Sequence, residues 1–196
     1  MPLDAQIVPK TRNAWHAVDK TALKYGRYCL YLHMIIALTG YMGAGKTTVG
    51  SIVADALGCT FIDLDDIIVK KAGKSIPEIF AQDGESGFRA LEAECLAKTI
   101  KKYSGSTVVL ALGGGTVTCP GAPELLQKNT LCIWLKASVE TLAARAAGPD
   151  RPLADEHFAE RYQAREPLYQ VAAHITLETD GLSSEEIADE IIIDCL

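Results

Sequence analysis

A glycine-rich segment near residue 40 carries the strongest chemical signal in the sequence. Residues 40–47, GYMGAGKT, satisfy the pattern G-x-x-x-x-G-K-[ST]. In this pattern backbone N–H groups turn toward phosphate oxygens, the lysine reaches the outer phosphates and the threonine hydroxyl ligates Mg²⁺. A plain glycine-rich turn with a surface lysine is the alternative, and the spacing disfavours it. The residues predicted to bind ATP here are Gly43, Ala44, Gly45, Lys46, Thr47 and Thr48.

Two acidic residues follow the next apolar run of the chain. Asp63 and Asp65 come directly after residues 59–62 and are two positions apart. On an extended backbone, side chains at this spacing point the same way, so we expect both carboxylates to face one site. The alternative is helix capping, which acidic residues favour at a helix N-terminus and which we prefer for Asp66.

Several later residues have structural explanations when each is taken alone. Arg89 and Glu92 are three apart on a predicted helix, which is the spacing of a solvated surface ion pair. Residues 113–115 are three glycines that suit a turn after a strand, although three in a row suggest close approach of the backbone to a ligand. Arg151 and Arg165 match an ordinary loop arginine and a helix-surface charge.

The elements that must position these residues are short apolar runs alternating with helical patterns. Strands are expected at 34–38, 59–62, 107–112, 131–135 and 173–177. Helices are expected at 49–57, 75–80, 85–101, 157–166 ahead of Pro167, and from Ser138 and Ser183 onward.

This alternation predicts a three-layer α/β/α fold, a five-stranded parallel sheet with helices on both faces. Ligands of such sheets bind beyond the carboxyl ends of the strands. Four of the segments singled out above lie at such ends: 40–48, 63–66, 113–115 and the loop around Arg151. The fold therefore brings the candidate residues to one edge of the sheet.

Length and composition narrow the classes of protein that fit. The 196 residues, 48% hydrophobic and 22% charged, suit one globular domain, and the net charge of −6 gives no overall basic balance for nucleic acid or an anionic membrane. The apolar stretch 28–38 is shorter than the roughly 20 residues of a bilayer span. Six scattered cysteines without a C-x-x-C pair suit a reducing cytosol. We expect a cytoplasmic monomer.

The domain assignment separates residues 1–33, an N-terminal extension with an excess of basic side chains, from a P-loop domain at 34–196. No N-K-x-D guanine-reading sequence is present, and the length leaves no room for the extra domains of motor or clamp-loading ATPases. A compact small-molecule kinase remains.

Six blocks in this order resemble the shikimate kinase family over residues 34–196. They are Gly43-x-Gly-Lys-Thr-Thr, Asp63-x-Asp65, Phe88-Arg89-x-x-Glu92, Gly113-Gly114-Gly115, Arg151-Pro-Leu and Arg165-x-Pro-Leu-Tyr169. The resemblance implies a P-loop kinase fold and transfer of the γ-phosphoryl group of Mg·ATP to the 3-hydroxyl of shikimate. That reaction serves chorismate and aromatic amino-acid synthesis.

The resemblance also implies roles for the acidic residues and the P-loop. Thr47 and Asp63 are expected at the Mg²⁺, with Asp63 acting through water. Asp65 is expected to bind the acceptor hydroxyls and to take the proton of the attacking one. Lys46, Asp65 and Arg151 are the predicted catalytic residues, with Arg151 in a lid at about 148–157 that closes on the phosphates of ATP.

Recognition of the acceptor is assigned by the same resemblance. Arg89 and Arg165 are expected to bind the shikimate carboxylate, and Glu92 to hold Arg89. Gly113, Gly114 and Gly115 are expected to contact the acceptor.

Three rival functions remain open at this point. One is another small-molecule P-loop kinase, such as a gluconate or nucleoside monophosphate kinase. Another is a catalytically silent nucleotide-binding module, which would need damaged motifs. A nucleic-acid role would have to depend on residues 1–33 and would be sensitive to salt. We expect ATP and shikimate as partners, with no nucleic acid and no membrane.

Overall fold

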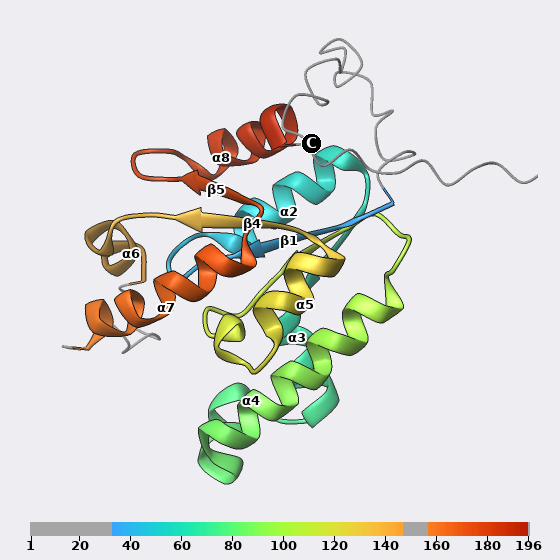
Figure 1. Ribbon diagram of the computed structural model, residues 1–196, viewed down its shortest axis with the longest axis vertical. Coiled ribbons are helices and arrows are strands. Elements are labelled where there is room, and N and C mark those ends of the chain that lie inside the picture. The colour runs from blue at the N-terminus through green and yellow to red at the C-terminus, as the bar shows by residue number, and fades with distance from the viewer. Residues whose placement is uncertain (1–32, 147–156, 196) are drawn as a thin grey trace, which may run out of the picture.

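The computed structural model describes residues 33–146 and 157–195 (Figure 1). The predicted N-terminal extension, apart from His33, lies outside the described residues. So does the predicted lid apart from His157, and with it Arg151. In the part of the chain that is described, no helix has both the length and the apolar character needed to cross a membrane.

The core of the molecule is a parallel sheet of five strands in the order β2-β3-β1-β4-β5. Every residue of the central strand is buried, as expected for a strand covered on both faces. The predicted α/β fold with a five-stranded parallel sheet is confirmed. The strands are β1 (Ile35–Thr39), β2 (Thr60–Asp63), β3 (Val108–Ala111), β4 (Leu131–Lys136) and β5 (Ile175–Glu178).

Helices cover both faces of this sheet. Helix α2 (Lys46–Leu57) packs against α8 (Ser184–Glu190), and α5 (Ala122–Asn129) packs against α7 (Phe158–Ala172). Figure 1 shows these two pairs on opposite sides of the strands, which completes the three layers. The helices are α2 (Lys46–Leu57), α3 (Leu64–Ala72), α4 (Ile76–Lys102), α5 (Ala122–Asn129), α6 (Val139–Ala146), α7 (Phe158–Ala172) and α8 (Ser184–Glu190), with a 3₁₀ turn η3 (Thr116–Thr118) and a π-helical turn η4 (Ile191–Cys195).

Local sequence signals set several helix ends as predicted. Gly58 ends α2 in the left-handed conformation, with φ 62°. The backbone N–H of Ser75 donates to Glu78 Oε2 at 2.8 Å, and Ser183 and Glu186 form the same capping box at the start of α8. These caps fix where α4 and α8 begin.

The structure confirms one feature of the predicted helices and differs from the prediction in two others. The helices expected at 75–80 and 85–101 are the two parts of α4, which is interrupted at Gly84 by a non-helical backbone with φ 67°. Helix α5, between the third and fourth strands, was not predicted. Helix α7 was expected to end ahead of Pro167 but continues through it to Ala172.

Packing explains why α7 tolerates its proline. A proline inside a helix removes one hydrogen bond and costs about 3 kcal/mol. The turn after Pro167 carries Tyr169, which is fully buried and stacks on Trp134 of β4 with ring centroids 5.6 Å apart. Burying a side chain of this size contributes energy of the same order, so tertiary contacts hold the last turn of α7 in place.

Candidate active site

The glycine-rich segment forms a turn between β1 and α2, as its pattern predicts. Gly40, Gly43 and Gly45 have φ values of 145°, 84° and 83°, a region that favours glycine. A Cβ at Gly40 would lie 2.6 Å from the Leu135 carbonyl oxygen, and one at Gly43 would collide with the carbonyl of Leu142 in α6. The turn therefore fits only because these positions lack side chains.

The lysine of this turn lies folded over its own loop. Lys46 Nζ donates to the carbonyl oxygens of Gly40 at 2.8 Å and Tyr41 at 3.0 Å. Helix α2 begins at the same residue, so its first N–H groups and the positive end of its dipole face the turn. The segment 40–48 has the cationic side chain and the backbone donors that a polyphosphate requires.

Asp63 lies at the end of β2 and accepts hydrogen bonds both from the P-loop and from Asp65. Its Oδ2 accepts a hydrogen bond from Thr47 Oγ1 at 2.9 Å, and its Oδ1 accepts one from the backbone N–H of Asp65 at 3.0 Å. Asp63 is thus the N-cap of α3. The preference for Asp66 as the capping residue was wrong.

The extended backbone expected for both Asp63 and Asp65 was also wrong. Asp63 is extended, but α3 begins at Leu64, so Asp65 belongs to the first helical turn and not to an extended backbone. Its carboxylate still faces the site, because a Cβ at Gly113, at the end of β3, would lie 3.0 Å from Asp65 Oδ1.

The surroundings of Asp65 disfavour its charged form. Burial, followed by the negative charges of Asp63 and Glu92, raises the pKa of Asp65 to about 6, while Lys46 acts in the opposite direction. A carboxylate with a pKa close to neutrality can accept a proton and release it again at physiological pH. Asp65 therefore has the electrostatics of a general base.

Thr47 and Asp63 together suit a magnesium ion. Their hydroxyl and carboxylate oxygens are hard ligands, and they already lie within 2.9 Å of each other. Within residues 33–146 and 157–195 no group of three or more His, Cys, Asp or Glu side chains could hold a metal. Mg²⁺ commonly takes only one or two protein oxygens, with phosphates and water completing its shell, so this donor set fits it.

Arg89 and Glu92 are not the solvated surface pair that their spacing allows. The Glu92 side chain is 1% exposed and the Arg89 side chain 18% exposed, and Arg89 Nη1 donates to Glu92 Oε2 at 2.6 Å. The second terminal nitrogen, Nη2, lies 3.4 Å from Oε1 of the exposed Glu85. Among the described residues, the buried Nε of Arg89 has no hydrogen-bond partner.

The three glycines after β3 allow close approach of other parts of the protein, and the predicted approach to a ligand stays a prediction. A Cβ at Gly113 would lie 2.8 Å from Glu92 Oε1, and one at Gly115 would collide with the Arg89 guanidinium. A Cβ at Gly114 would lie 3.2 Å from the backbone nitrogen of Met42 in the P-loop. The segment 113–115 thus lies directly against the P-loop and beneath Arg89.

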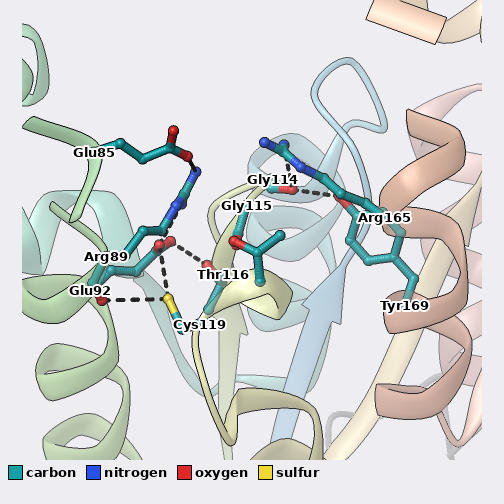
Figure 2. A network of polar contacts seen from close by, with 10 residues as sticks. Glu85, Arg89, Glu92, Gly114, Gly115, Thr116, Cys119, Arg165 and Tyr169 are labelled. Carbon is teal, nitrogen blue, oxygen red and sulfur yellow. Dashed lines mark hydrogen bonds and ion pairs between the residues drawn. The ribbon is translucent and has the colours of Figure 1, made fainter. Parts of the chain in front are cut away.

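Arg165 reaches the same segment from α7. Its Nη1 donates to the Gly114 carbonyl oxygen at 3.4 Å, and the Tyr169 hydroxyl donates to the same oxygen at 2.5 Å. The guanidinium also lies over the Tyr41 ring, 5.4 Å from its centroid. Figure 2 shows Arg89 and Arg165 on opposite sides of the glycine segment, both near its backbone.

The structure thus brings together all the predicted site residues that it describes, at the carboxyl ends of β1, β2 and β3. Sequence reasoning missed Thr116 and Cys119, whose side chains donate to Glu92 Oε1 at 2.6 Å and Oε2 at 3.3 Å (Figure 2). Neither residue belongs to a motif.

Comparisons with known proteins agree with this geometry. The family model for shikimate kinase matches residues 42–196. Shikimate kinase of Symbiobacterium thermophilum is 39% identical over 167 residues, which is 81% of this chain and 94% of that protein. Shikimate kinase of Limosilactobacillus fermentum is 41% identical over 165 residues, 81% of this chain and 94% of that protein.

Solved structures give the same result. Shikimate kinase from Acinetobacter baumannii, in a complex with shikimate, superposes with a TM-score of 0.74 at 35% identity, covering 81% of this chain and 90% of that one. Shikimate kinase from Aquifex aeolicus has a TM-score of 0.72 at 29% identity, with coverages of 83% and 96%.

Proposed function

Since the chain belongs to the shikimate kinase family, a family of ATP-dependent kinases, we propose that it phosphorylates the 3-hydroxyl of shikimate in the site described above. One observation carries the assignment of the site. The glycine segment 113–115 packs against the P-loop through Gly114 and Met42, and Arg89 and Arg165 lie on its two sides. An anionic acceptor held by the two arginines therefore lies beside the phosphate-binding turn.

The P-loop binds the phosphates of ATP. The N–H groups of residues 43–48 face the phosphate oxygens at the start of α2, and Lys46 exchanges its contacts with loop carbonyls for contacts with the outer phosphates. Most of the rate in phosphoryl transfer comes from positioning and from neutralising charge. These groups supply both.

Arg89 and Arg165 bind the carboxylate of shikimate. A planar guanidinium can donate two parallel hydrogen bonds to a carboxylate, and Arg89 is held with only part of its donor capacity in use. Gly113, Gly114 and Gly115 contact the acceptor through their backbone. This arrangement selects a hydroxylated acid over a neutral sugar.

Asp65 accepts the proton of the attacking hydroxyl. In the transfer, the 3-oxygen of shikimate forms a bond to the γ-phosphorus, the bond from that phosphorus to the bridging oxygen of ADP breaks, and the hydroxyl proton moves to the Asp65 carboxylate. For a loose transition state the base acts mainly by orienting the hydroxyl. Its pKa of about 6 leaves it mostly ionised at neutral pH.

Thr47 and Asp63 hold the Mg²⁺ that accompanies ATP. The ion, when bound, neutralises charge on the phosphate oxygens. Asp63 also fixes the backbone of Asp65 through the cap of α3, so one carboxylate supports both the metal position and the position of the base.

Three predictions complete the proposal. Arg151, outside the described residues, closes on the phosphates as part of the lid at 148–157. The enzyme is a monomer of the cytoplasm. It uses no nucleic acid or membrane partner.

A coupled assay of ADP release tests the function. Purified protein with Mg·ATP is measured alone and with shikimate, gluconate, other hydroxylated acids and nucleoside monophosphates. Release that depends on shikimate supports the proposal. Release with another acceptor keeps a P-loop kinase but overturns the roles of Arg89 and Arg165, and silence with every acceptor despite ATP binding supports a nucleotide-binding module.

A further inference from the structure

The carboxylate of Glu92 is buried and bound by three donors. Its Oε2 accepts from Arg89 Nη1 at 2.6 Å and from Cys119 Sγ at 3.3 Å, and its Oε1 accepts from Thr116 Oγ1 at 2.6 Å. An ionised carboxylate that is out of water needs partners for both oxygens. Arg89 satisfies one oxygen, and Thr116 satisfies the other.

Two of these donors, Thr116 and Cys119, follow shortly after the glycine segment. Thr116 begins the short turn η3, and Cys119 is the C-cap that follows it. The stretch 113–119 therefore supplies the backbone that lies under Arg89 and also the two side chains that hold the glutamate behind Arg89 (Figure 2). A shift of residues 113–119 would therefore move the backbone under Arg89 and the side chains that hold Glu92 together.

We propose that Thr116 and Cys119 are positioning residues for the acceptor, because they fix the Glu92 carboxylate at the angle that directs Arg89 over Gly115. The proposal rests on the proposed function, in which Arg89 binds the shikimate carboxylate. It assigns shikimate affinity to two side chains that contact Glu92 and are not assigned any contact with the acceptor.

The competing partner of Arg89 shows why such positioning is needed. Glu85, one turn earlier in α4, lies 3.4 Å from Arg89 Nη2 and its side chain is 67% exposed. If the Glu92 carboxylate rotates, Arg89 loses its short hydrogen bond and Glu85 remains as its nearest carboxylate. The guanidinium would then move toward solvent and away from Gly115.

The two donors differ in strength. Thr116 is fully buried and donates a short hydroxyl hydrogen bond, which is strong when the acceptor is charged. A thiol is a weak donor, and Cys119 also lies 3.5 Å from the Arg89 carbonyl oxygen. Burial raises the pKa of Cys119 to about 12, so the thiol keeps its proton at neutral pH. Thr116 is expected to have the larger effect.

The test compares Thr116→Val with Thr116→Ser in the steady-state assay with shikimate and ATP. Valine keeps the shape of threonine and lacks the donor. We expect Thr116→Val to raise the KM for shikimate about tenfold, from the strength of one hydrogen bond to a charged group. The KM for ATP should stay within twofold, and Thr116→Ser should restore the parent value. Cys119→Ala should raise the KM for shikimate about threefold, and Cys119→Ser should not.

Thr130→Val is the matched control. Thr130 is also buried and donates its hydroxyl at 2.7 Å, but to the Leu126 carbonyl at the end of α5, away from Glu92. Thr130→Val also removes a buried hydroxyl donor, here from a neutral carbonyl, and it leaves Glu92 untouched, so its KM for shikimate should not change. Equal changes in Thr116→Val and Thr130→Val, or a parallel loss of ATP affinity in Thr116→Val, would overturn the proposal.

Arg89→Lys separates failure of this inference from failure of the proposed function. If Arg89→Lys raises the KM for shikimate and neither Thr116→Val nor Cys119→Ala does, the inference is wrong and the function stands. If Arg89→Lys leaves that KM unchanged, the assignment of Arg89 falls and the inference falls with it. In the Arg89→Lys background, Thr116→Val should add less than twofold, because coupled residues are not additive.

Discussion

Asp65→Asn is expected to abolish turnover and at the same time to stabilise the protein at neutral pH. Burial and neighbouring carboxylates raise the pKa of Asp65 from 3.8 to about 6. Because the folded protein holds this proton more tightly than the unfolded chain, Asp65 contributes stability below pH 3.8 that is lost as the pH rises through about 6. Asparagine carries no charge at any pH, so the Asp65→Asn variant does not lose this stability as the pH rises.

The shift of roughly two pKa units sets the size of the effect. At 1.36 kcal/mol per unit, ionised Asp65 costs about 3 kcal/mol at pH 7.5 and well under about 1 kcal/mol at pH 4. Asp66→Asn is the matched control, because Asp66 is exposed and lies in the same first turn of α3. Both variants lose a favourable interaction with the helix dipole of about 0.3–1 kcal/mol, and only Asp65→Asn relieves a buried charge.

Denaturant unfolding of the ligand-free protein at pH 7.5 and pH 4 measures this difference. Asp65→Asn should be about 2–3 kcal/mol more stable than Asp66→Asn at pH 7.5, and the gap should nearly close at pH 4. A gap that does not depend on pH, or an Asp65→Asn variant that is the less stable of the two at pH 7.5, would refute the electrostatic account of the site.

Three further outcomes follow from the same geometry. The kcat/KM for shikimate should fall about tenfold per unit as the pH drops below about 6, since protonated Asp65 accepts no proton; a profile that stays flat to pH 5 would remove its role as base. Lys46→Ala should abolish ADP release with an unchanged circular dichroism spectrum, and near-normal turnover would contradict its contact with the phosphates. Gly115→Ala should raise the KM for shikimate while leaving the KM for ATP unchanged, because its Cβ meets the flexible end of Arg89; an unaltered KM for shikimate would place the acceptor elsewhere.

The parts of the fold that sequence predicts well are those set by local pattern. Strands of a parallel sheet are short continuous apolar runs because both faces are buried, and residues 35–39 show this plainly. The P-loop follows from spacing alone, because the glycines are required by backbone conformation at fixed positions. Helix α5 has only eight residues, with Pro123 near its start, so its pattern is too short to stand out.

The parts that sequence predicts poorly depend on tertiary contacts. The three-residue spacing of Arg89 and Glu92 is the same for a surface pair and a buried one, and only the packing of residues 113–119 on α4 distinguishes them. Thr116 lies 24 positions from Glu92, so no local motif reports their contact. Asp65 shows the reverse case, because its carboxylate faces the expected edge of the sheet although the extended backbone predicted for it was wrong.

A ³¹P and ¹H NMR spectrum of the complete reaction tests the central claim most directly. Protein, Mg·ATP and shikimate are incubated together, and the phosphorus signals of ADP and of any new ester are followed with time. One equivalent of a phosphate ester at the 3-position of shikimate per ADP formed is the result that this account predicts. ADP accompanied only by inorganic phosphate, or an ester at another hydroxyl, would contradict it.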